Sequence, residues 1–139
     1  MLVALISLAF ATLISWPAVH RWGSRGFMLP AACVVVAFVS LLTLAPGILS
    51  GDAVALSVPW IPALDVSLSF RLDALAWVLA LVVTGIGAIV LFYCSAYFSD
   101  DEPALPRFAT TLSAFAAVMF GLVASDDIIV MFMFWEITS

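Results

Sequence analysis

Lysine is absent from this chain, and charge of either sign is scarce. Of the 139 residues, 9% are charged and 66% are hydrophobic, whereas about a quarter of the residues in soluble domains are charged. Apart from His20, the basic side chains are Arg21, Arg25, Arg71 and Arg107. A formal net charge of −5 with so few cations offers no basic patch for nucleic acid. We therefore expect a membrane protein that does not bind nucleic acid.

Cysteine is also rare. Cys33 and Cys94 each lie in an apolar run, without a second cysteine or a histidine at ligand spacing. Cysteines of this kind usually serve as small apolar packing residues. The sequence therefore predicts no metal site, no cofactor and no disulfide framework.

Long stretches without charge determine the predicted fold class. A transmembrane helix needs about 17–25 apolar residues. The first apolar run is followed, not preceded, by arginines, which indicates a retained span and not a cleaved signal. The sequence predicts an all-α membrane protein with four complete transmembrane helices plus the first half of a fifth, at residues 2–19, 27–45, 72–93, 108–124 and 128–139.

The connections between these helices are expected to differ in kind. Residues 47–70 contain prolines, glycines and short alternating stretches, which favour a short extramembrane loop or hairpin between the second and third helices. Pro46-Gly47 is expected to end the second helix. Ser69 is a candidate N-cap for the third helix and would place Asp73 in its first turns. Polar loops are expected at 20–26 and 95–107, and a tight turn at 125–127.

The arginines also predict an orientation. Three of the four lie in the loops at 20–26 and 95–107, and only Arg71 lies on the other side. Because cytoplasmic loops are enriched in Lys and Arg, we expect these two loops to be cytoplasmic. The N-terminus would then lie outside, in a multi-pass protein of the cell (inner) membrane.

Glu136 is the single charge in the last apolar run. It follows eight uninterrupted apolar residues, Ile128 to Trp135. Nine helical residues from Asp127 to Glu136 rise roughly 13–14 Å, close to half of a hydrocarbon core about 30 Å thick. Ionisable groups at that depth are rare and mark ion or proton pathways. We therefore expect a buried, proton-carrying carboxylate, with Ser139 on roughly the same helix face.

The last run is too short to cross a bilayer. Residues 128–139 would span about 18 Å as a helix. We expect the native polypeptide to continue beyond Ser139, so that this sequence is the N-terminal fragment of one larger transmembrane domain.

Four segments in this order resemble a known family. They are Ser67–Leu75, Val83–Gly87 with Tyr93–Tyr97, Met119–Asp127, and Phe134–Ser139. Together they are similar to the N-terminal part of the large, A-type subunit of the multisubunit Na⁺/H⁺ antiporters of the Mrp type. That subunit is related to the L chain of proton-pumping NADH–quinone oxidoreductase. The Phe-Trp-Glu-Ile-Thr-Ser sequence at 134–139 favours the antiporter branch.

The resemblance implies a subunit that works in a complex with other membrane proteins and exchanges H⁺ and Na⁺ across the lipid bilayer. Glu136 would match the proton-carrying glutamate of the family, whose partner lysine lies two helices further on. Asp73, Asp126 and Asp127 are candidate supporting residues. The chain has Ala74 where the family usually has Gly, and Asp127 where it usually has Asn. The extra acid either biases cation or proton access or is simply solvated.

Three functions remain open at this point. The first is a subunit of a cation/proton antiporter, which is a transporter and not an enzyme. The second is the related proton-pumping chain of a respiratory NADH–quinone oxidoreductase-like complex. The third is a structural assembly subunit, in which Glu136 is satisfied by a neighbouring helix and Asp73 is only a helix cap.

Overall fold

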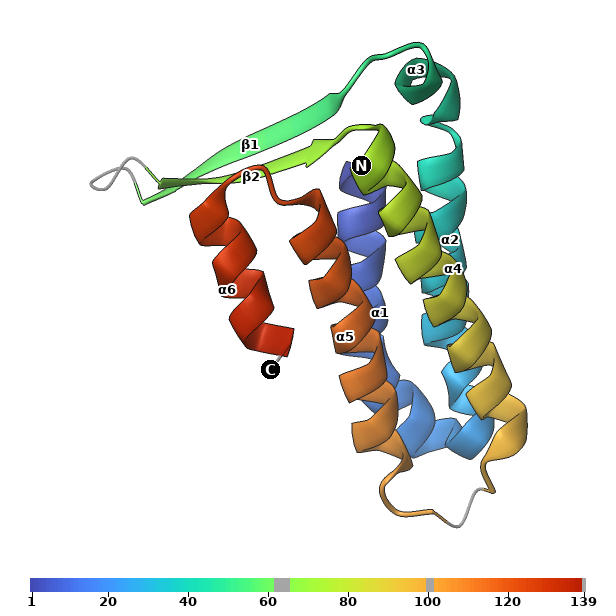
Figure 1. Ribbon diagram of the computed structural model, residues 1–139. Coiled ribbons are helices and arrows are strands. Elements are labelled where there is room, and N and C mark those ends of the chain that lie inside the picture. The colour runs from blue at the N-terminus through green and yellow to red at the C-terminus, as the bar shows by residue number, and fades with distance from the viewer. Residues whose placement is uncertain (62–65, 100–101, 139) are drawn as a thin grey trace.

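The chain forms a helical bundle with a β-hairpin across one end (Figure 1). The computed structural model describes residues 1–61, 66–99 and 102–138. Its elements are α1 (Leu2–Trp22), the 3-10 helix η1 (Gly23–Phe27), α2 (Met28–Leu42), α3 (Ala45–Leu49), β1 (Val54–Ile61), β2 (Val66–Leu72), α4 (Ala74–Tyr97), α5 (Leu105–Ala124) and α6 (Ile128–Thr138). The long helices alternate in direction, so the N-terminus and the start of α6 lie at the hairpin end and η1 lies at the opposite end (Figure 1).

Three helical ranges among the described residues are long and apolar enough to cross a membrane. They are Leu2–Leu42, Ala74–Tyr97 and Leu105–Ala124. The first contains α1, η1 and α2 and folds back on itself at η1 (Figure 1). The shorter apolar helix α6 has 11 residues. The helical, membrane-protein part of the predicted class is confirmed, whereas the count of four complete transmembrane helices plus half of a fifth stays a prediction.

Several predicted boundaries were wrong for local reasons. The expected polar loop at 20–26 is helical, because α1 continues to Trp22 and η1 follows it directly. The second helix ends at Leu42, and Pro46 lies in the first turn of α3 and does not break a helix. Pro106 likewise lies in the first turn of α5. Proline has no N–H, but the first N–H groups of a helix have no partner inside the helix, so proline is tolerated there.

The predicted hairpin is present. Strands β1 and β2 are antiparallel, with Val54 opposite Leu72 and an irregularity between Pro59 and Ile61. Proline is tolerated at such a position because a two-stranded sheet has only edge strands. Residues 62–65, between the two strands in sequence, lie outside the described residues. Strand β2 ends at the fully buried Leu72, which anchors the hairpin to the bundle.

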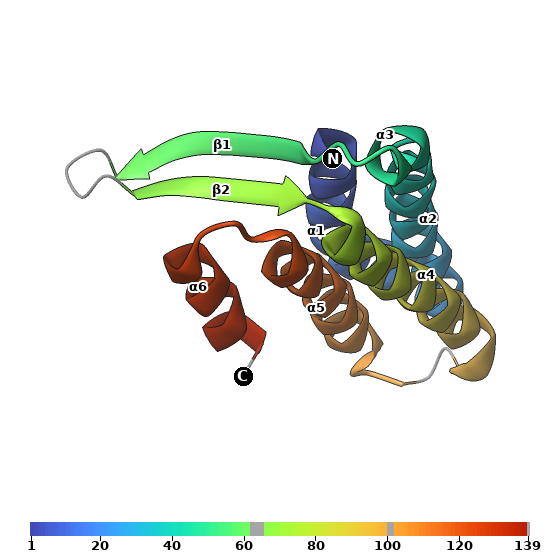
Figure 2. The same cartoon turned by 45° about the horizontal axis from the view of Figure 1, so that its top comes forward.

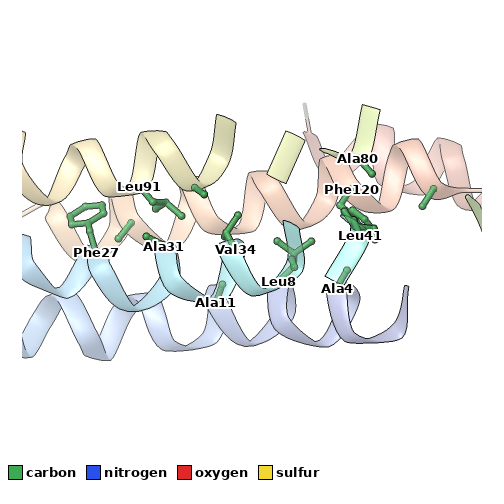
Figure 3. Close-up of a cluster of buried hydrophobic side chains, with 14 of the residues drawn as sticks. Ala4, Leu8, Ala11, Phe27, Ala31, Val34, Leu41, Ala80, Leu91 and Phe120 are labelled. Carbon is green, nitrogen blue, oxygen red and sulfur yellow. The ribbon is translucent and has the colours of Figure 1, made fainter. Parts of the chain in front are cut away.

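Small residues and a few polar contacts hold the helices together. The Ser15 and Ser113 hydroxyls, both fully buried, lie 2.8 Å apart and join α1 to α5. The Trp77 indole N–H donates to the Leu41 carbonyl at 2.8 Å and joins α4 to α2. Figure 3 shows alanines among the buried side chains of the bundle. In lipid the hydrophobic effect does not drive helices together, and small residues allow the close packing that holds them.

The outer surface of the bundle is apolar. Large side chains are exposed along its helices, among them Leu13 at 75% and Ile89 at 70%. Of the two cysteines, Cys94 is buried and Cys33 is half-buried, and both are free thiols. A bundle whose outer surface carries large apolar side chains suits a lipid environment.

Gly26 allows the chain to turn back after α1. A Cβ atom at this position would lie 2.5 Å from both the Ala18 carbonyl oxygen and the Val19 Cα atom. Both are backbone atoms, so they cannot move aside as the end of a side chain can. The turn at η1 therefore requires glycine at position 26.

Replacing Gly26 with alanine should destabilise the α1–η1 turn. Overpacking in a close-packed site costs about 1–3 kcal/mol or more, and here the neighbour is backbone. Thermal unfolding of the complete subunit in detergent should show a lower midpoint for Gly26→Ala. Gly47→Ala is the matched control, because its Cβ would meet only Asp52 Oδ2 at 3.9 Å. Equal midpoints for the two variants would contradict the turn's dependence on Gly26.

Candidate functional site

Helix α6 presents Glu136 on the side turned away from α5. Val130 is fully buried and Phe134, four residues later, is half-buried against the core. Ile129, Phe132 and Glu136 recur at helical spacing on another face and are exposed. Residues three and four apart share a helix face. Glu136 therefore belongs to an outward-facing stripe of apolar side chains.

The expected burial of Glu136 is not observed within the described residues. Its helical neighbours Trp135 and Ile137 are also exposed, at 60% and 59%. The carboxylate thus lies on an apolar surface, and its burial near the midplane stays a prediction. Ser139, the expected neighbour on this face, lies outside the described residues.

Asp127 caps the helix that carries Glu136. Its carboxylate oxygen Oδ1 accepts hydrogen bonds from the backbone N–H groups of Ile129 at 2.7 Å and Val130 at 3.4 Å. Its carbonyl accepts the N–H of Met131 at 2.9 Å. Asn and Asp are about equally good at the N-cap, so Asp127 can replace the usual asparagine without losing this interaction. Neither interpretation from the sequence, biased ion access or simple solvation, included this role.

Asp73 caps α4 in the same way. Its Oδ1 accepts the backbone N–H of Ala76 at 2.9 Å. The prediction that Ser69 caps this helix was wrong, because Ser69 is still within β2, which continues to Leu72. The alternating Ser-Leu-Ser-Phe pattern at 67–70 extends the strand up to the cap.

Ser69 instead joins the hairpin to the start of α6. Its carbonyl accepts the backbone N–H of Asp126 at 2.9 Å, and Phe70 pairs with Ser125 as an isolated β-bridge. The turn after α5 is therefore held by β2, as Figure 2 shows from the hairpin end. This pairing had no signal in the sequence, because it joins segments that are far apart along the chain.

Two of the predicted supporting residues line one pocket at the hairpin end. The pocket has a volume of about 200 Å³, and its polar lining residues are Arg71, Asp73, Ser125 and Asp126. Neither Asp127 nor Glu136 lines it. Sequence reasoning used Arg71 only for orientation and missed its place beside the two acids. The position of Arg71 two residues before Asp73 was the only feature of the sequence that could have indicated that they share this pocket.

Among the described residues, the side chains that could bind a metal are not clustered. Across residues 1–61, 66–99 and 102–138, no group of three or more His, Cys, Asp or Glu side chains could hold a metal ion. Of the described carboxylates, Glu136 is the one that lies within an apolar helix.

Comparison with known proteins identifies the family. Residues 60–109 match the family model described as NADH-Ubiquinone oxidoreductase (complex I), chain 5 N-terminus. The protein named "Putative antiporter subunit mnhA2" of Staphylococcus haemolyticus is 44% identical over 94 residues, covering 68% of this chain and 12% of that protein. The protein of the same name in Staphylococcus saprophyticus is 37% identical over 105 residues, covering 76% of this chain and 13% of that protein.

A solved structure agrees over almost the whole chain. The Mrp complex from Dietzia sp. DQ12-45-1b contains a chain that is 32% identical, with a TM-score of 0.85, covering 96% of this chain and 14% of that chain. This chain belongs to the family of A-type Mrp antiporter subunits. The resemblance expected from the four sequence segments is confirmed.

The same fold occurs in a more distant complex. A chain of the archaeal membrane-bound sulfane sulfur reductase, a respiratory membrane complex, has a TM-score of 0.77 at 17% identity, covering 98% of this chain and 21% of that chain. At that identity the likeness shows the fold alone. The described bundle is therefore shared between the A-type Mrp antiporter subunits and a respiratory complex.

The capping role of Asp127 predicts different outcomes for two substitutions. Asp127→Asn should keep the cap, and Asp127→Ala should lose about 1 kcal/mol of local stability. Hydrogen–deuterium exchange in the complete subunit should show faster exchange at the Ile129 and Val130 amides in Asp127→Ala only. Exchange at these amides in Asp127→Ala that is as slow as in the unmodified subunit would show that the Asp127 side chain does not act as a cap.

Proposed function

We propose that this chain is part of a membrane subunit of a multisubunit monovalent cation (Na⁺)/proton antiporter. The observation that carries the proposal is Glu136 on the apolar helix α6, in a chain whose relatives are antiporter subunits. The chain spans only 12–13% of the length of those relatives. Its partners would be the other membrane subunits of the complex, H⁺ and Na⁺, and the lipid bilayer.

The proposed topology has four crossings and the start of a fifth. In it α1, α2, α4 and α5 each cross the membrane and α6 begins the next crossing. The alternating directions of these helices support this arrangement (Figure 1). Arg21, Arg25 and Arg107 lie in the elements opposite the hairpin end, which we assign to the cytoplasm by the positive-inside rule. The N-terminus and the hairpin would then lie outside a cell (inner) membrane.

Glu136 would act as the proton carrier. Burial favours the neutral acid, and a nearby cation favours the carboxylate. A glutamate covered by further helices could therefore take up a proton when its partner cation withdraws and release it when the cation returns. A lysine in this role would have to come from outside these residues, since the chain contains no lysine.

A related candidate function is supported by the family model. The description of that model names complex I, so a proton-pumping chain of a respiratory complex would account for the same helix and glutamate. Co-purification with flavin and iron–sulfur subunits would favour this function. The 44% identity to an antiporter protein favours the antiporter.

Replacing Glu136 tests the proposed role directly. In the complete complex, Glu136→Gln should abolish Na⁺-driven proton exchange, because the amide cannot carry the proton and is otherwise of similar size and shape. Exchange is measured in membrane vesicles with a fluorescent pH indicator, and assembly is measured on a native gel. Glu102→Gln is the control, since Glu102 is exposed in the connection before α5 and exchange should persist.

The two measurements separate the remaining possibilities. Full exchange by an assembled Glu136→Gln complex would rule out Glu136 as the carrier. Loss of the assembled complex on the native gel would favour the structural assembly role instead.

A further inference from the structure

Gly121 on α5 leaves room for an aromatic ring from α6. A Cβ atom at Gly121 would lie 2.5, 2.6 and 2.8 Å from Cε1, Cζ and Cδ1 of Phe134. The Phe134 ring therefore occupies the space that a side chain at position 121 would need. Gly121 is buried, so a side chain there would force either the half-buried Phe134 ring to turn aside or α6 to move.

The hairpin closes the other side of this contact. The Phe70 and Phe134 ring centroids are 6.0 Å apart at an interplanar angle of 53°, a favourable tilted arrangement. Phe70 is only 8% exposed. We refer to Phe70, Gly121 and Phe134 as the Phe134 cluster. It joins β2, α5 and α6 at one place.

The supports of the cluster are themselves fixed. The Ser125 hydroxyl donates to the Gly121 carbonyl at 2.7 Å, and Ser125 pairs with Phe70. The Asp126 N–H donates to the Ser69 carbonyl at 2.9 Å. Gly121 and Phe70 are thus held together by contacts that do not involve α6. Phe134 packs between these two fixed residues.

This contact determines the direction in which Glu136 faces. Phe134 and Glu136 are two residues apart, which is about 200° around a helix at roughly 100° per residue. With Phe134 against Gly121, the Glu136 side chain lies on the outward face of α6, where it is exposed. Rotating or shifting α6 at Phe134 would move the carboxylate by a comparable amount.

We propose that Gly121, Phe134 and Phe70 are positioning residues for Glu136, which set the depth and rotation of the carboxylate toward its exchange partner. This inference rests on the proposed role of Glu136 as proton carrier. The cluster does not touch the proton path itself. It acts through the placement of α6, and small displacements of a reacting group lower rates steeply.

Two variants of the complete complex change the cluster in opposite ways. Gly121→Ala adds a methyl group where the ring lies, and Phe134→Leu removes the ring atoms Cε and Cζ. Each should lower cation-driven proton exchange per assembled complex by roughly ten- to a hundredfold, as expected for a misplacement of about 1 Å. Each should also shift the pH at which exchange is half-maximal, because the surroundings of the carboxylate change.

The double variant and a control glycine make the test specific. In the double variant Gly121→Ala with Phe134→Leu, the added methyl group can occupy part of the space that the removed ring atoms leave. The double variant should therefore recover part of the proton-exchange rate. Gly87→Ala on α4 is the matched control, because its Cβ would meet the nearest atoms at ordinary distances of 3.5 and 3.7 Å. Exchange by Gly87→Ala should equal that of the unmodified complex.

The outcomes distinguish this inference from the proposed function. If Glu136→Gln abolishes exchange but the cluster variants keep the normal rate and pH profile per assembled complex, the positioning role is overturned and the carrier role stands. Variants that only reduce the amount of assembled complex also overturn it. If Gly121→Ala fails to assemble, Phe134→Leu decides, since it loosens the contact without adding volume.

Discussion

Every backbone N–H and C=O group that enters hydrocarbon must be satisfied by the protein itself, and this constraint organises the whole chain. It explains why the apolar runs are helices and why irregular backbone is confined to the ends of the bundle. Two helix starts, those of α4 and α6, are completed by Asp73 and Asp127, whose carboxylates accept the first free N–H groups. Among the described residues, no buried side-chain nitrogen or oxygen atom lacks a hydrogen-bond partner.

The same constraint explains which parts of the fold could be predicted from the sequence. Apolar run length and the absence of charge predict the long helices, and alternation in 66–70 predicts the second strand. The errors occurred at residues whose local preference is compatible with two different structures. Pro46 was interpreted as a helix end and Pro106 as part of a loop, whereas both lie near helix starts. Residues 20–26 are polar enough for a loop, yet they continue as helix because Gly26 can pack against the backbone of α1.

The sequence predicts which residue is the candidate carboxylate, because a lone glutamate after eight apolar residues is rare, and its function stays a prediction. The sequence does not predict the surroundings of this carboxylate. Its exposure on α6 could not be predicted, since the rotation of α6 is set by Phe134, Gly121 and Phe70, which come from three separate segments. Asp127 illustrates the opposite case. Its position before an apolar run is a recognisable capping signal, whereas the two interpretations from its acidity were biased ion or proton access and simple solvation.

The hydrogen bond between Ser69 and Asp126 has a consequence for biogenesis. In the proposed topology the hairpin lies outside the membrane, and because domains form from the N-terminus during synthesis, it could fold before α5 is complete. The edge of β2 that receives the turn after α5 is then already formed when Asp126 arrives. In the proposed topology, α6, which carries Glu136, would thus enter the bilayer after the hairpin, which binds the turn before α6, has already folded. A delay in hairpin folding would leave the helix that carries Glu136 without this contact during insertion.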